Sequence, residues 1–216
     1  LEHCVDADKT TVYIGLDYPP SEKHVDGWKK IDNYLNWKES NNSFYKLVVI
    51  RRQKNCGLNG ENSNASLLYK HLKQIGYDRY IISEDDNVFS PNFLVYINKG
   101  LEKFKNNNRI LCICGYTHPY QLKFKDNTFF FHNVYCSAWG QGRWVSKVEE
   151  YDQWKDPHYF RNSFSLKNLI KMFKVGRRKV VIYLRLCRNY NTVPMTDYNT
   201  MAGGPVSRFP PLYNGL

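Results

Sequence analysis

No stretch of this 216-residue sequence approaches the run of about 18 apolar residues that a membrane-spanning helix needs. Its first residues also lack the basic segment and the apolar core of a secretory signal. Six cysteines are too few for a disulfide scaffold in a chain of this length, and no CxxC spacing occurs. We therefore expect a soluble protein of a reducing compartment, the cytoplasm.

Acidic residues are missing from one long segment. Residues 157–196 contain nine Lys or Arg and no Asp or Glu, so this segment accounts for most of the net charge of +11. Such a patch can bind nucleic acid, an anionic membrane surface or a phosphorylated substrate. Alternatively, it can be a helix face exposed to solvent. We expect peripheral contact with an anionic membrane and no nucleic acid, because an acidic triplet elsewhere in the chain would be out of place on a phosphate-binding surface.

The composition that is present, 42% hydrophobic and 16% aromatic, is typical of one domain with a sizeable core. Apolar runs alternate with helix signals through the first half of the chain. Strands are predicted near residues 11–17, 45–50, 79–83 and 109–114, and helices at 21–40, 61–76 and 90–104. This alternation predicts an α/β fold with a largely parallel sheet whose strands are buried on both faces. Beyond residue 115 the pattern loosens: 128–136 could be a strand, 163–173 predicts a short helix, and 179–186 fits either type.

The predicted helices carry boundary and packing signals. Ser21 and Ser90 are candidate N-caps, Pro91 suits the first helical position, and Gly76 and Gly176 are candidate stops. Helical spacing points one set of apolar residues inward: Trp28, Ile31, Leu35, Ala65, Leu68, Leu72, Ile75, Phe93, Ile97, Leu101 and Phe104. Cys112 and Cys114, two apart in an apolar run, should share one strand face as buried thiols rather than hold a metal.

The most informative feature is the acidic triplet Glu84–Asp86 at the end of the third predicted strand. In an open α/β sheet, ligands bind outside the carboxyl ends of the strands, where Asp17 and the segment RRQKNCGLNG (51–60) are also expected. Neighbouring carboxylates repel one another unless a cation compensates. Mg²⁺ or Mn²⁺ held by one or two carboxylates and substrate phosphates is the usual compensation. The alternative is that the acids merely favour a helix start, although Ser90 already serves as its cap and the acids precede it by more than a turn.

These residues resemble a family. EDD after a strand, followed by SPNF, looks like the DxD-type motif of the GT-A glycosyltransferases, and most closely that of the N-acetylglucosaminyltransferase I type and related bacterial nucleotide-sugar enzymes. Three further pieces resemble that family in the same order: YIGLDYP (13–19), RRQKNCGLNG (51–60) and CSAWGQGRW (136–144). The likeness implies a GT-A catalytic domain over 1–216, with a nucleotide-sugar-binding half (1–115), an acceptor-side half (116–216) and an N-terminus that is incomplete.

The resemblance also implies roles for individual residues. Asp86 would ligate Mn²⁺ or Mg²⁺, with Asp85 helping and Glu84 nearby, and Asp17 would accept a hydrogen bond from the uracil of a UDP-sugar donor. Asn55 and Gly57 would shape the donor pocket. A glycine also lets the backbone approach a ligand closely, although Gly57 could equally sit in an ordinary turn.

The segment CSAWGQGRW (136–144) is read as an acceptor-side loop. Trp139 and Trp144 could form a wall against a sugar ring, or could equally anchor the loop to the core. Gly140 and Gly142 suggest a mobile loop that closes over the donor and excludes water.

Transfer with inversion needs a general base for the acceptor hydroxyl, and a carboxylate is the usual choice. Asp197 occupies the place that the resembled enzymes give to this base, Asp152 is the other candidate, and an unidentified residue is a third possibility. We expect transfer to a hydroxyl of a glycan or lipid-linked acceptor in bacterial polysaccharide biosynthesis. A nucleotidyltransferase and a non-catalytic binding module for nucleic acid or anionic surfaces are the alternatives.

Overall fold

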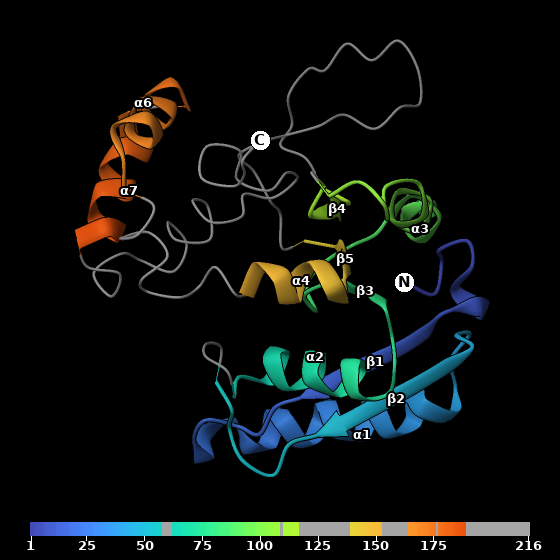
Figure 1. The fold of residues 1–216 in the computed structure, drawn as a ribbon. Helices are drawn as coiled ribbons and strands as arrows, with labels where there is room; N and C mark the ends of the chain where they lie inside the picture. The colour runs from blue at the N-terminus through green and yellow to red at the C-terminus, as the bar shows by residue number, and fades with distance from the viewer. Residues whose placement is uncertain (58–61, 109, 117–138, 153–163, 176, 189–216) are drawn as a thin grey trace. The chain divides into compact units, whose positions relative to one another are not determined.

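The computed structural model describes residues 1–57, 62–108, 110–116, 139–152, 164–175 and 177–188 (Figure 1). The chain divides into two compact units, and each is described by itself. The first comprises Leu1–Tyr77 and Val88–Val95, and the second comprises Asp78–Asn87 and Tyr96–Leu216.

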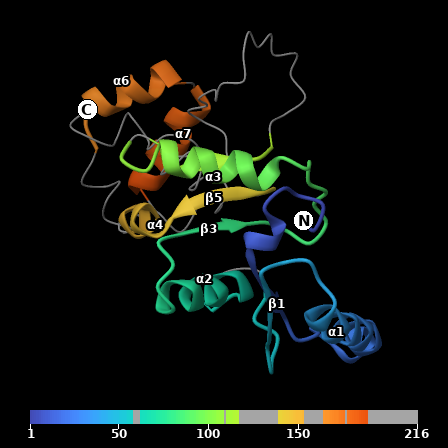
Figure 2. The same ribbon diagram turned by 90° about the vertical axis from the view of Figure 1, so that its right-hand side faces the viewer.

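The first unit is built on a parallel pair of strands. Its elements are η1 (Ala7–Lys9), β1 (Thr11–Leu16), η2 (Glu22–His24), α1 (Val25–Ser40), β2 (Lys46–Arg51) and α2 (Asn64–Gln74). β1 and β2 run parallel in a register that pairs Thr11 with Lys46 and Leu16 with Arg51. α1 and α2 lie on opposite sides of β1 (Figures 1 and 2). Both strands were predicted, and their parallel pairing confirms the α/β class.

The expected burial of these strands on both faces is wrong. All six residues of β1 are half-buried, and only Leu47 and Val49 of β2 are buried. In the described part of the chain this sheet has two strands, which is too narrow a surface to bury a whole helix stripe. Thus Leu35 of α1 is buried whereas Ile31, expected inside, is 52% exposed.

Helix boundaries agree only in part with their predicted caps. α1 begins at Val25, after a 3-10 turn, and the Oγ of Ser21 lies 2.9 Å from His24 Nδ1 instead of capping a backbone amide. α2 is capped by Ser63, whose side chain accepts from the Ser66 amide. Gly76 follows α2 with φ of 94°, which explains the stop, because this backbone conformation favours glycine. In α2, Leu68 and Leu72 are half-buried, but Ala65 and Ile75 are exposed.

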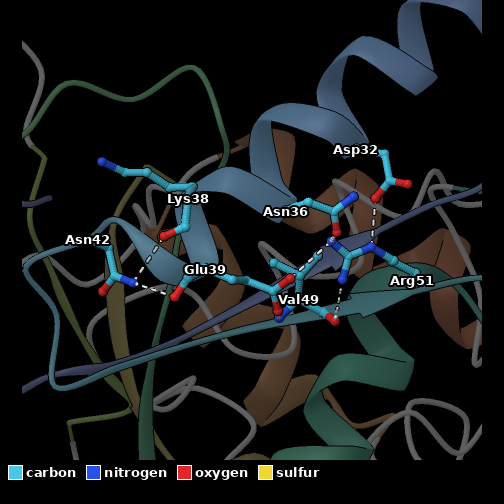
Figure 3. A network of polar contacts seen from close by, with 7 residues as sticks. All are labelled: Asp32, Asn36, Lys38, Glu39, Asn42, Val49 and Arg51. Atoms are coloured by element: carbon cyan, nitrogen blue, oxygen red, sulfur yellow. Dashed lines mark hydrogen bonds and ion pairs between the residues drawn. The ribbon is translucent and has the colours of Figure 1, made fainter.

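Arg51 at the end of β2 ties the sheet to α1 through a polar network (Figure 3). Its Nε donates to Asp32 Oδ1 at 2.6 Å, and its Nη2 donates to Asn36 Oδ1 at 2.6 Å and Glu39 Oε2 at 3.0 Å. Glu39 also accepts from the backbone amide of Val49 at 3.1 Å. The hydrogen bond to Asp32 is the main cause that raises the pKa of Arg51. The network fixes α1 against β2 and so sets where the strand end beyond Arg51 lies.

The second unit contains an antiparallel three-stranded sheet. Its elements are β3 (Arg79–Ile82), β4 (Cys112–Cys114), β5 (Gln141–Trp144), α4 (Val145–Asp152), α6 (Leu166–Val175) and α7 (Arg177–Arg188); α3 (Phe93–Lys103) begins in the first unit and continues here. β5 lies between β3 and β4 and is antiparallel to both. The predicted largely parallel sheet is therefore corrected here, because a segment read as a loop supplies the middle strand. The described residues thus form a parallel two-stranded sheet in the first unit and an antiparallel sheet in the second.

The core of this unit lies between α3 and β5 (Figure 2). The predicted stripe of α3 is confirmed, with Ile97 and Leu101 almost fully buried. A Cβ on Gly142 would come within 2.5 Å of Ile97 Cγ2, so this glycine permits close packing of helix on strand. α3 begins at Phe93, whose amide donates to the Ser90 carbonyl, and not at the predicted Ser90–Pro91 start.

The buried side chain of Lys147, on α4, binds the backbone of the segment that follows α3. Its Nζ donates to the carbonyls of Phe104, Asn107 and Ile110 at 2.8 to 3.0 Å and lies 3.6 Å from the centre of the Trp144 ring. A buried ammonium is tolerated because its protons are satisfied and the ring face attracts the cation. Lys147 thereby ties the successive turns that follow α3 to α4.

The remaining expectations concern the cysteines and the last helices. Cys112 and Cys114 share a strand face as predicted, with their Sγ atoms 3.9 Å apart. The helix predicted at 163–173 is confirmed as α6, and the segment that fitted either type is helical as α7. The strand considered at 128–136 lies outside the described residues. Among the helices of the described ranges, none has the length and apolar character needed to cross a bilayer.

Candidate functional site

Asp17 stands just past the end of β1 and binds the loop that follows β2. Its Oδ1 accepts from the amides of Tyr18 and Cys56, both at 2.9 Å. Its Oδ2 accepts from the amides of Cys56 at 3.2 Å and Gly57 at 3.1 Å. Three backbone amides thus converge on one carboxylate, which joins two strand ends that the sequence predicted to be neighbours.

Asn55 and Trp28 complete this turn. Asn55 Nδ2 donates to the Tyr18 carbonyl at 2.6 Å, and Trp28 Nε1 donates to the Asp17 carbonyl at 2.7 Å. The ring of Tyr18 packs against that of Trp28 with centroids 5.6 Å apart. Gly57 has φ of 70°, a conformation in which glycine is favoured and a side chain is strained. We call the group formed by Asp17, Tyr18, Asn55, Cys56 and Gly57 the Asp17 turn.

Arg52 is a candidate that the sequence reasoning missed. Its Nε donates to Asn64 Oδ1 at 3.0 Å, and Asn64 Nδ2 donates to the Gly15 carbonyl at 2.6 Å. The Nη2 of Arg52 is buried and has no hydrogen-bond partner among the described residues. A buried guanidinium N–H without an acceptor is costly, so a ligand oxygen would be favoured there. The signal was present in the sequence as a second basic residue at the carboxyl end of a strand.

The acidic triplet follows β3 in the second unit and lies in open solvent. Glu84, Asp85 and Asp86 are all exposed, and Asp85 and Asp86 form a turn. Asn87 Nδ2 closes this turn by donating to Ser83 Oγ at 2.8 Å and to the Glu84 carbonyl at 3.3 Å. In the described part of the chain the three carboxylates have no hydrogen-bond or ion-pair partner. We call residues 83–87 the acidic turn.

The geometry of the acidic turn weakens the view that it serves the following helix. α3 begins at Phe93, seven residues after Asp86, whereas the helix dipole acts within the first turn. No group of three or more His, Cys, Asp or Glu side chains is placed to hold a metal ion among the residues described. The donor set itself fits the hard divalent ions, which need only one or two carboxylates when a substrate supplies phosphate oxygens.

The two tryptophans of the predicted acceptor-side loop have different environments. Trp139 is 46% exposed and packs edge to face on Tyr116, with ring centroids 4.7 Å apart. Trp144 is buried beneath Lys147 and anchors the core, so a sugar wall at this position is ruled out. The expected mobile loop is also wrong for residues 141–144, because they form β5, and Gly142 serves close packing.

The two candidate bases cannot be ranked by their contacts. Asp152 is the last residue of α4, and its side chain lies outside the described set. Asp197 falls in the range 189–216, which is also outside it. The Asp17 turn and the acidic turn belong to different units, so their predicted convergence at one sheet edge stays a prediction.

Comparisons with protein-family models, with curated proteins and with solved structures found no match. The functional argument therefore depends on the geometry of the residues described above.

Proposed function

We propose that this protein is a metal-dependent glycosyltransferase that moves a sugar from a nucleotide-sugar donor, a UDP-sugar, to a hydroxyl of a glycan or lipid-linked acceptor. The observation that carries the proposal is the acidic turn, where exposed carboxylates that have no partner among the described residues follow a strand and stand clear of the next helix start. Such carboxylates contribute nothing evident to the fold. They are suited to a divalent cation that is completed by a diphosphate.

Asp86 is the first candidate ligand and Asp85 the second. A divalent ion held there would neutralise charge on the departing nucleoside diphosphate. A GT-A fold over the whole chain belongs to this proposal. So does a cytoplasmic location beside the pool of nucleotide sugars.

The Asp17 turn would serve the donor through its shape. Because the Asp17 carboxylate already accepts from three backbone amides, its role in this proposal is to hold Gly57 and Asn55 beside the nucleobase. A direct contact with uracil would have to compete with those amides for the carboxylate oxygens. Arg52 adds a buried N–H donor suited to a phosphate oxygen. Exposed Trp139 is the better of the two tryptophans for stacking on a sugar ring.

The decisive experiment is calorimetry with a set of sugar nucleotides, with and without Mn²⁺. We expect one nucleotide to bind the parent in a metal-dependent manner. Binding to Asp86→Ala should be about 100-fold weaker, since replacing even a residue that only supports a metal ligand typically costs roughly 10- to 100-fold in metal affinity. Binding to Asp26→Ala should be unchanged. Asp26 is also exposed but lies on α1, far from any strand end in sequence. If no nucleotide binds with metal, or if Asp86→Ala binds as well as the parent, the proposal fails.

The base is found by separate substitution of Asp152 and Asp197 with Asn. The variant that lacks the base should lose turnover but keep metal-dependent donor binding, because a base acts on the acceptor hydroxyl in the transition state. Release of inorganic pyrophosphate from a nucleoside triphosphate and a sugar phosphate would instead identify the nucleotidyltransferase alternative. The anomeric configuration of the product decides whether transfer is inverting, as we propose.

A further inference from the structure

α6 and α7 have several large apolar side chains that the fold leaves exposed to solvent. The two helices contact one another and lie side by side in both views (Figures 1 and 2). Met172 of α6 and Tyr183 of α7 are fully buried and fix the inner faces of the two helices. On the outer faces of the two helices, several large apolar residues are exposed: Leu166, Ile170, Phe173, Val181 and Leu184. Phe164, two residues before α6, is also exposed.

On α6 the exposed apolar residues form a stripe. Leu166, Ile170 and Phe173 are spaced by four and three residues, so they lie one above another on one helix face. They are 72%, 51% and 61% exposed. The apolar sector of α6 therefore extends from the buried side at Met172 to a side that faces solvent. A soluble helix that serves only its own core would end its apolar sector at the buried side.

Cations follow this apolar stripe with the same spacing. Lys167, Lys171 and Lys174 each follow a stripe residue by one position, so they form a parallel basic stripe about 100° around the helix. On α7, Arg177, Arg185 and Arg188 are exposed around Val181 and Leu184. No acidic residue occurs in either helix. The outer surface of the pair is thus apolar and cationic.

We propose that the outer surface of α6 and α7 docks on an anionic lipid bilayer, with Leu166, Ile170 and Phe173 entering the headgroup layer and the adjoining lysines binding lipid phosphates. Helices that lie in the interface of a membrane have such an apolar stripe flanked by Lys and Arg. α6 and α7, with 10 and 12 residues, are too short to span a bilayer. The cytoplasmic leaflet is the anionic one, and basic side chains near it add to the binding. A lipid-linked acceptor would lie in the same plane, but the docking surface stands on α6 and α7 alone.

Two other occupants fit this surface less well. Single-stranded nucleic acid is bound by cations and flat aromatic rings, whereas leucine, isoleucine and valine make up most of the exposed apolar set here. A second copy of the chain would bring two surfaces of the same charge together, and the cores of protein interfaces are depleted in charged residues. An anionic bilayer can accommodate the aliphatic side chains in its headgroup layer and bind the cations through its lipid phosphates.

Vesicle flotation tests the proposal with phosphatidylcholine alone and with phosphatidylcholine mixed with phosphatidylglycerol. The full chain is expected to float only with the anionic vesicles, and less so as ionic strength rises, because salt screens the charges. Ile170→Ser should weaken vesicle binding about tenfold, since a large aliphatic side chain no longer leaves water. Ile31→Ser is the matched control, because Ile31 is 52% exposed on α1, and it should bind like the parent.

A second pair of variants separates a local charge effect from net charge. Lys167→Gln with Lys174→Gln should weaken binding about 25-fold at low salt, at about fivefold for each cation removed. Lys29→Gln with Lys30→Gln removes the same net charge from exposed positions of α1 and should change little. Unchanged thermal unfolding of all variants shows that each is folded.

Four outcomes would overturn the proposal. One is equal flotation with neutral and anionic vesicles, and another is equal loss of binding in the α1 controls. The third is tighter binding to single-stranded oligonucleotide than to anionic vesicles, and the fourth is a dimer in sedimentation velocity that Ile170→Ser dissociates. No nucleotide sugar enters these assays, so their result is independent of the glycosyltransferase proposal.

Discussion

The Asp17 turn and the acidic turn both place carboxylates just beyond a strand, yet the surroundings of those carboxylates are opposite. Asp17 accepts from three backbone amides on two loops and holds the ends of β1 and β2 together. Asp85 and Asp86 are exposed, and no partner for them exists among the described residues. The Asp17 carboxylate is therefore part of the fold. The carboxylates of Asp85 and Asp86 are available to a ligand.

This difference separates stability from function at the level of single residues. Removing an acceptor from converging amides leaves donors without partners and destabilises the protein. Removing an exposed carboxylate leaves water in its place and costs almost nothing. Four predictions test the contrast, beginning with the largest effect.

Asp17→Ala should lower the free energy of unfolding by about 3 kcal/mol, because three amide donors lose a charged acceptor. Chemical denaturation measures the change. Asp17→Asn keeps one acceptor oxygen and should lose about half as much. A loss below about 0.5 kcal/mol for Asp17→Ala would show that the turn is not held by this carboxylate.

Gly57→Ala should cost about 1 kcal/mol, because the backbone of Gly57 has φ of 70° and disfavours a side chain even though the space around it is open. Gly27→Ala is the matched control: Gly27 also has open space around it but lies in α1, where alanine is favoured by about 0.5 to 1 kcal/mol. The two substitutions should therefore shift the unfolding midpoint in opposite directions. A shift in the same direction contradicts the left-handed conformation at Gly57.

Asn87→Ala should lower the free energy of unfolding by about 0.5 kcal/mol, because the Asn87 side-chain amide makes two hydrogen bonds within the acidic turn, which is partly exposed. Its larger consequence should be a weaker metal-dependent binding of nucleotide, since the turn that carries Asp85 and Asp86 is less ordered. Calorimetry and denaturation of one variant measure both. An unchanged nucleotide affinity would separate Asn87 from the site.

Asp86→Asn should leave stability without ligand within about 0.5 kcal/mol of the parent. With Mn²⁺ and UDP present, thermal unfolding of the parent should move upward, and that of Asp86→Asn should not, because only a ligand that binds the native state stabilises it. Equal upward shifts in both proteins would place the metal elsewhere. Destabilisation of Asp86→Asn without ligand would remove the contrast with Asp17.

Most elements of the fold were predictable from local pattern. β1, β2, β3, α2, α3 and α6 appear where periodicity and turn residues placed them, and Gly76 ends α2 as its φ requires. Apart from the helix starts at Ser21 and Ser90, the misses share one cause, which is that they depend on neighbours far away in sequence. The four residues of β5 carry no strand signal of their own, and they form a strand because β3 and β4 lie on either side of them.

The candidate site divides in the same way. That Asp17 would meet the loop after β2 followed from the rule that parallel strands bring their carboxyl ends together, and the structure confirms it. That its carboxylate would be occupied by backbone amides could not be foreseen, because the direction of amide groups in an irregular loop is set by tertiary packing. The same holds for Trp144, whose burial under Lys147 depends on carbonyls that follow α3.

By itself, the sequence determined the order of helices and strands from β1 to β4, the acidic turn after the third strand and the basic character of α6 and α7. These features depend on side chains a few residues apart, for which periodicity is a sufficient guide. The tertiary structure alone decided which strands pair and in which direction, which apolar stripes are covered and which carboxylate has its hydrogen bonds already filled. Those outcomes depend on contacts between residues tens of positions apart, and such contacts form only when the whole chain competes for them.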